Sequence, residues 1–238
     1  MTVEISTDDD IRIIRLANGR RANSLTMQML DELVEAFGAV TDDEAVRGVL
    51  LCADPAAGFS AGMDTSLFET DDPNRAYAVI SRLGDVCQAV KDCPVPVAVA
   101  MRRYVIGGAL EVAAAAEFRV STADTFFQMP EVRIDIPSVL ETVNLHRLMG
   151  WTLATEIVLT GEQYGAELML ARGYLNRIAD DPEAACRELL AQVSLSSRHV
   201  IAQQKRLSNR WRNLHEREAI DDTRNEFALA FTRRIHDR

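Results

Sequence analysis

The stretch Gly107-Gly108-Ala109-Leu110-Glu111 decides how the rest of this sequence is understood. It stands between an apolar segment that ends near Met101 and an apolar helix expected from Leu110 to Ala116. The first N–H groups of a helix have no intrahelical partner and lie at the positive end of the helix dipole. We therefore expect the Gly108 N–H to favour a developing oxyanion. The alternative is that the two glycines only permit a tight turn from strand to helix.

Two further segments strengthen the first interpretation. Glu131 follows Pro130 and lies twenty residues after Glu111. Upstream, the loop Phe59-Ser60-Ala61-Gly62-Met63-Asp64 can turn backbone N–H groups toward a substrate oxygen. Paired carboxylates can move protons beside such an oxygen, so the three segments together are suited to enolate chemistry. A carboxylate in the first turn of a helix also stabilises the helix by itself, which is the alternative explanation for Glu111.

In this order, the three motifs resemble those of the crotonase superfamily, the enoyl-CoA hydratases and isomerases. The resemblance extends from about Asn23 to about Ile178, with smaller marks at Asn23-Ser24-Leu25, Leu159-Thr160-Gly161 and Gly173-Tyr174-Leu175. It implies an α/β fold with a crotonase-like ββα spiral core, followed by a helical C-terminal trimerisation region. Residues 1–181 would form the core and residues 182–238 the helical region.

The resemblance also implies roles for individual residues. Glu111 and Glu131 match the two catalytic carboxylates, and the backbone N–H groups of Met63 and Gly108 match the oxyanion hole that holds a thioester oxygen. Contacts with the substrate are implied for the residues around these positions: Ala61, Gly62, Asp64, Gly107, Pro130, Ser138 and Glu141. Asp64 is in addition expected to cap a short turn from Thr65 to Phe68, because Asp is a favoured N-cap residue.

The implied reaction is the hydration of a 2-enoyl-CoA, in which the two carboxylates hold a water molecule between them. A double-bond isomerase that relies on Glu131, or a C–C hydrolase, is the neighbouring alternative on the same fold. A catalytically silent homologue that serves as a binding or structural subunit is an alternative of a different class. Coenzyme A would enter as part of the substrate, with no separate cofactor and no metal.

The sequence departs from the family pattern at three places. Arg102-Arg103 stands where relatives commonly carry Asn-Gly, and Ile134-Asp135 stands where they often have Leu-Gly. After Pro137, a glycine-rich stretch is replaced by Ser138-Val139-Leu140-Glu141-Thr142, which is expected to reshape the acyl pocket and to add Glu141 as a third carboxylate. Coenzyme A carries phosphates that need local positive charge, for which Arg102, Arg103 and Lys205 are the candidates.

A remote alternative is a serine hydrolase. Gly58-Phe59-Ser60-Ala61-Gly62 satisfies the GxSxG pattern of a nucleophile elbow, in which Ser60 would be the nucleophile. An elbow places its serine directly after a strand, whereas Asp54-Pro55-Ala56-Ala57 separates Ser60 from the strand expected to end near Cys52.

The remaining pattern predicts strands alternating with helices. Strands are expected at Ile11 to Leu16, Arg47 to Cys52, Val97 to Met101, Phe118 to Ser121 and Tyr174 to Ile178. Apolar residues at spacings of three and four predict helices over Asn74 to Val90 and around Leu30 to Phe37. From about Pro182 to Arg234 the pattern is wholly helical, and its apolar positions predict a trimer or a pair of trimers.

Composition excludes several other classes. The formal net charge of −10 argues against nucleic acid or an anionic membrane as the main partner. No apolar run approaches the roughly 20 residues that span a bilayer, and the first residues lack the features of a signal peptide, so a cytoplasmic protein is expected. The four cysteines show no CxxC pairing and are expected to be reduced, without a zinc site.

Overall fold

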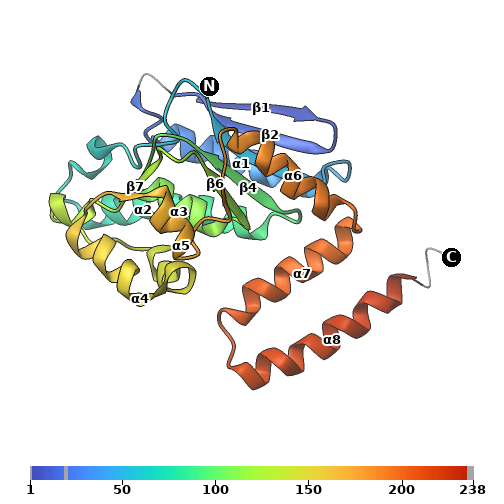
Figure 1. Ribbon diagram of the computed structural model, residues 1–238. Coiled ribbons are helices and arrows are strands. Elements are labelled where there is room, and N and C mark those ends of the chain that lie inside the picture. Colours follow the sequence, from blue (N-terminus) through green and yellow to red (C-terminus); the bar gives the residue numbers. More distant parts are fainter. Residues whose placement is uncertain (1, 19–20, 235–238) are drawn as a thin grey trace.

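The computed structural model describes residues 2–18 and 21–234 of the chain. At its centre lies a six-stranded sheet with the strand order β1-β2-β3-β4-β6-β9 (Figure 1). The first pair of strands forms an antiparallel hairpin, and the other neighbours are parallel. The strands are β1 (Val3–Asp8), β2 (Ile11–Leu16), β3 (Gly48–Ala53), β4 (Val97–Met101), β6 (Phe118–Ser121) and β9 (Arg177–Ile178).

A second sheet of three short strands has the order β5-β7-β8. Its strands are β5 (Tyr104–Ile106), β7 (Phe126–Gln128) and β8 (Tyr164–Gly165). Strand β5 follows β4 after two residues, and β7 follows β6 after a short turn, so the chain twice passes from the large sheet to the small one. A helix or a helical turn comes next each time, which gives the ββα succession that the resemblance implied.

Helices cover both faces of the large sheet. Helices α1 (Met27–Asp42), α2 (Pro73–Asp92) and α3 (Gly108–Ala115) pack against one another, and every residue of α3 is buried. Helix α6 (Pro182–Ser194) packs on β3, β4 and β6, where Leu190 is buried with Leu50. Leu190 is one of the apolar positions after Pro182 from which a trimer was predicted, and for this residue the reasoning is wrong, because the sheet of the same chain covers it.

The remaining helices lie beside this core. They are α4 (Thr142–Thr160), α5 (Ala166–Ala171), α7 (Arg198–Trp211) and α8 (Glu216–Arg234). Gly150 interrupts α4 with a φ of 80°. Figure 1 shows α7 and α8 as an antiparallel pair that extends away from the sheets. No helix in the described residues is long and apolar enough to cross a membrane, and no group of His, Cys, Asp and Glu there could hold a metal ion.

Three predicted strands, those over residues 11–16, 97–101 and 118–121, have the observed bounds. The strand predicted from Tyr174 to Ile178 is wrong over its first three residues, since only Arg177–Ile178 pairs with β6. Gly173 turns the chain with a φ of 89°, and Tyr174 is buried with its hydroxyl donating to the Leu110 carbonyl at 2.9 Å. Its apolar ring therefore belongs to the core beneath α3 rather than to a sheet.

Candidate active site

Gly107 and Gly108, at the start of α3, are required by close approach as well as by the turn. Gly107 precedes the helix with φ 53° and ψ −125°, a conformation that L side chains rarely adopt. A Cβ on Gly107 would lie 2.5 Å from the Glu131 Oε1. Gly108 is the first residue of α3, where an N–H has no intrahelical partner. The segment therefore brings a free helix N-terminus and a carboxylate to the same place.

The loop that contains Met63 meets this helix N-terminus. Leu25 donates to the Gly62 carbonyl at 2.8 Å and accepts from the Asp64 N–H at 3.0 Å, which makes a parallel bridge between Leu25 and Met63. Successive N–H groups of an extended chain alternate in direction, so the Met63 N–H points away from Leu25. A Cβ on Gly108 would lie 3.3 Å from the Met63 Cγ, which shows how closely the two segments approach.

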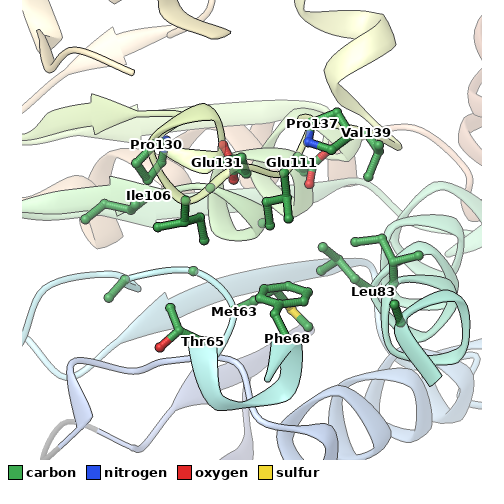
Figure 2. A pocket seen from close by; sticks show the side chains of 18 of the residues that line it. Met63, Thr65, Phe68, Leu83, Ile106, Glu111, Pro130, Glu131, Pro137 and Val139 are labelled. Atoms are coloured by element: carbon green, nitrogen blue, oxygen red, sulfur yellow. The ribbon is translucent and has the colours of Figure 1, made fainter. Parts of the chain in front are cut away.

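Both segments line a cavity of about 420 Å³. Figure 2 shows Glu111 and Glu131 on one wall, with Met63 and Phe68 across from them and Leu83 of α2 at the side. Apart from the two glutamates, the walls are mostly apolar. The cavity contains most of the site residues expected from the sequence, namely Ala61, Gly62, Met63, Gly107, Gly108, Glu111, Pro130 and Glu131.

Glu111 is only 3% exposed and is held by one residue of α4. Its Oε1 accepts hydrogen bonds from the Thr142 backbone N–H at 3.2 Å and from the Thr142 hydroxyl at 3.0 Å. Burial raises the pKa of Glu111 to about 8, although the bonds from Thr142 act in the opposite direction. The negative charges of Glu131 and Glu141 add to the rise. Near neutral pH this carboxyl can therefore hold or release a proton.

Glu131 opens the helical turn η3 (Glu131–Ile134) directly after Pro130. Its Oε2 accepts a hydrogen bond from the Ser138 hydroxyl at 3.0 Å. Burial raises the pKa of Glu131, and the bond from Ser138 opposes this rise. The cavity is therefore lined by two carboxyl groups of raised pKa together with Met63 and Gly108, whose backbone N–H groups are the expected oxyanion donors, an arrangement suited to moving protons beside a stabilised oxyanion.

Three residues expected to contact the substrate lie outside the cavity lining. Glu141 forms an ion pair with Lys91 and accepts from the Asn144 amide at 2.7 Å, so it is not a third carboxylate of the acyl pocket. Ser138 instead supports Glu131. Asp64 caps the turn η2 (Thr65–Phe68) by accepting from the Ser66 N–H at 3.1 Å, as the sequence predicted.

The serine-hydrolase alternative is wrong, because Ser60 is fully buried. Its hydroxyl donates to the Asn23 carbonyl at 2.7 Å and accepts from the Gly62 N–H at 3.1 Å. Ser60 therefore fixes the shape of the loop that carries Met63. The Gly62 position is equally confined, since a Cβ there would lie 2.5 Å from the Ile106 carbonyl oxygen.

The expected phosphate-binding cations lie in different environments. Lys205 is buried, donates to the carbonyls of Val90 and Val95, and pairs with Glu117 at 3.0 Å. It is therefore wrong as a coenzyme A ligand. The Arg102 side chain binds the start of α6 through the Asp180 carbonyl and the Asp181 carboxylate. Arg103 is exposed and stays a candidate.

Thr142 is a residue of this site whose role no sequence pattern indicated. It lies in the segment that departs from the family pattern, thirty-one positions from Glu111. Only the packing of the α4 N-terminus against α3 brings its N–H and hydroxyl to the same carboxylate oxygen.

The ββα succession, with a carboxylate pair beside a helix N-terminus, defines a crotonase fold. Its overall backbone is similar to solved enoyl-CoA hydratases. One from Thermoplasma volcanium superposes with a TM-score of 0.90 at 26% identity and covers 98% of this chain and 93% of that one. One from Mycobacterium smegmatis gives a TM-score of 0.91 at 24% identity, over 97% and 91% of the two chains.

The sequence comparisons give the family. A family model described as enoyl-CoA hydratase/isomerase matches residues 6–233, and the chain belongs to this family. Cyclohexa-1,5-dienecarbonyl-CoA hydratase of Thauera aromatica is 29% identical over 202 residues, which are 83% of this chain and 76% of that protein. The fatty acid oxidation complex subunit alpha of Shewanella baltica is 28% identical over 198 residues, 81% of this chain but only 28% of that subunit.

Proposed function

We propose that the protein hydrates a 2-enoyl-CoA, with Met63 and Gly108 as oxyanion donors and Glu111 and Glu131 as the acid/base pair. The observation that carries this proposal is the presence of all four groups on one cavity whose other walls are mostly apolar. Membership of the enoyl-CoA hydratase/isomerase family supports it.

The oxyanion donors lower the barrier to adding a nucleophile. The thioester oxygen accepts hydrogen bonds from the Met63 and Gly108 N–H groups, which stabilise the enolate that forms when the β-carbon is attacked. One such donor is typically worth about 3 to 4 kcal/mol of transition-state stabilisation. Only backbone atoms are needed, which explains why a flexible apolar side chain is tolerated at position 63.

The glutamates complete the proton balance. One carboxylate takes a proton from a water molecule as the water oxygen bonds to the β-carbon. The other carboxyl, in its protonated form, gives its proton to the α-carbon as the enolate collapses. One water is consumed, and proton exchange with solvent resets the pair. Two carboxyls of raised pKa suit this exchange, because one of them must be protonated at the working pH.

The cavity walls also bear on the acyl group and on the coenzyme. Phe68, Leu83, Ile106 and Val139 offer no polar partner to an acyl chain, so the substrate is apolar beyond its thioester. The phosphates of coenzyme A need a cation near the cavity mouth, for which Arg103 is the remaining candidate.

Substitution of the two glutamates tests the proposal. Glu111→Gln and Glu131→Gln keep the shape of the side chain but remove the proton-transfer group, so each is expected to lower crotonyl-CoA hydration by about 10²- to 10⁴-fold. Binding of the thioester, measured by calorimetry, should stay nearly unchanged. Glu167→Gln, at an exposed position of α5, is the matched control and should retain full activity.

The same variants distinguish the alternatives. Shifting a double bond along one acyl chain needs a single carboxylate, so an isomerase would lose activity with Glu131→Gln and keep it with Glu111→Gln. A wild-type protein that binds acyl-CoA but turns over neither hydratase nor isomerase substrates would point to the silent homologue.

A further inference from the structure

A second cavity, of about 320 Å³, shares no lining residue with the cavity that contains Glu111 and Glu131, which we call the acyl cavity. Its walls come from the end of α2, the start of α4 and the end of α7. The acyl cavity is mostly apolar, whereas charged and amide side chains dominate this one: among them Lys91, Asp92, Glu141, Arg147, Asn209 and Arg212. We call it the α2/α4/α7 cavity.

The acidic side chains of this cavity already have partners. Glu141 pairs with Lys91 and accepts from Asn144. Asp92 accepts from the Gln88 amide at 2.9 Å on the same helix. Glu141 is therefore engaged with both α2 and α4, and Asp92 with its own helix.

The two arginines of the cavity, Arg147 and Arg212, lack carboxylate partners within the residues that the structure describes. Arg147 donates to the Asn144 side-chain oxygen at 3.0 Å, and neither Arg147 nor Arg212 forms an ion pair with a carboxylate in the described part of the chain. The Nη1 atom of Arg212 is buried and has no hydrogen-bond partner among the described residues. Burial lowers the pKa of Arg119, and the positive charge of Arg212 lowers it further, so the two guanidinium groups are close enough to repel each other.

A buried guanidinium nitrogen without an acceptor costs free energy, and a bound ion or an ordered water is a common partner of such a group in native proteins. Arginine presents a planar fork of donors that matches the oxygens of carboxylates and phosphates. An anion in this cavity would supply the acceptor that Arg212 Nη1 lacks and the negative charge that no described carboxylate provides to Arg147 or Arg212.

We propose that the α2/α4/α7 cavity binds a small oxyanion, a phosphate or a carboxylate, between Arg147 and Arg212. The cavity has room for such an anion together with a few waters. Because its walls come from three helices, a bound anion would tie the end of α7 to the core and stabilise the folded chain.

Calorimetry on the whole chain tests this site, with inorganic phosphate and malonate as separate probes at constant ionic strength held with sodium chloride. Three variants are compared with wild type: Arg212→Gln, Arg147→Gln, and Arg172→Gln as an exposed control outside the cavity. At least one of the two probes should bind wild type at one site per chain and raise its melting temperature. Binding should weaken at least tenfold in each cavity variant and stay unchanged in Arg172→Gln.

The probe that binds more tightly identifies the class of anion. Absence of binding by both probes would overturn the proposal. Equal affinity in wild type and both cavity variants would overturn it as well, because the anion would then bind elsewhere, such as near the acyl cavity. If Arg212→Gln does not fold, the exposed Arg147 decides through its own variant. The readout is binding, so the result does not depend on whether the protein is a hydratase.

Discussion

Glu111 shows how the chemistry of this site opposes its stability. A carboxylate that is only 3% exposed carries a desolvation penalty, and the two hydrogen bonds from Thr142 only partly offset it. Proteins commonly tolerate such groups where proton transfer needs a pKa near neutrality.

Arg103 and Asp135 show a second cost at the scale of single residues, since their φ values of 61° and 59° lie in the left-handed region. They keep the turn at positions where the resemblance implies glycine, at a cost in backbone strain.

The raised pKa of Glu111 predicts how stability changes with pH. Between the ordinary value of 4.5 and about 8, the folded state holds a proton that the unfolded state releases. The stabilisation from this proton is fully present below pH 4.5 and is lost as the pH rises through 8. Between pH 4.5 and about 8, the free energy of unfolding falls by at most about 1.4 kcal/mol for each pH unit. Urea unfolding of wild type and Glu111→Gln at pH 5 and pH 8 should therefore show the variant gaining relative stability at pH 8. A difference that does not change with pH would contradict the buried environment.

Helix α7 illustrates, at the scale of one element, what a sequence pattern cannot decide. The sequence makes Lys205 of this helix a candidate cation for the phosphates of coenzyme A. Lys205 instead binds the carbonyls at the end of α2, and Arg198 donates to the carbonyls of Val40 and Val46. Arg210 pairs with Asp222 and Glu226 of α8. Charge and helical spacing are the same for an exposed cation and for one that donates to a neighbour's carbonyls, so only the docking of the helix distinguishes them.

Lys205→Met should consequently destabilise the chain. The substitution keeps the length of the side chain but removes the donor to the carbonyls of Val90 and Val95 and the cation beside Glu117, whose carboxylate still accepts from the Val97 N–H. Removing one partner of a buried pair typically costs about 3 to 5 kcal/mol, and because Glu117 is partly exposed we expect about 3 kcal/mol. Arg206→Met, the exposed neighbour on α7, should change the free energy of unfolding by less than about 0.5 kcal/mol. Equal effects in urea titrations would mean that Lys205 does not anchor α7.

For the whole molecule, the sequence predicted the parts that depend on local pattern. Strands such as Val97–Met101 are continuous apolar runs, and α2 has a regular amphipathic spacing, so their bounds were close to those observed. Strands β5 and β7 have three residues each, too few for a period to be recognised. The motifs were sufficient to identify the glutamates and glycines of the site. The role of Thr142, and the position of Glu141 outside the cavity lining, depend on tertiary packing and could not be predicted from the sequence.

The assembly of the molecule is the remaining prediction at this scale. Helix α8 packs against α7, but large apolar side chains of α8 itself stay exposed to solvent. Among them, Phe227 is 70% exposed and Ile220 is 51% exposed. Monomeric proteins rarely leave such contiguous apolar surface in water. We therefore expect this surface to be covered by copies of the same chain, in a trimer or a pair of trimers.

Light scattering coupled to size exclusion at micromolar concentration measures this directly. Wild type should elute with the mass of three or six chains, and Phe227→Glu should shift the distribution toward the monomer, because a charge buried in an apolar interface loses its hydration. Gln163→Glu adds the same charge in an exposed loop before β8 and should leave the mass unchanged. Monomeric wild type would show that α8 stays uncovered, while an unaltered oligomer in Phe227→Glu would place the subunit contact on another face of the molecule.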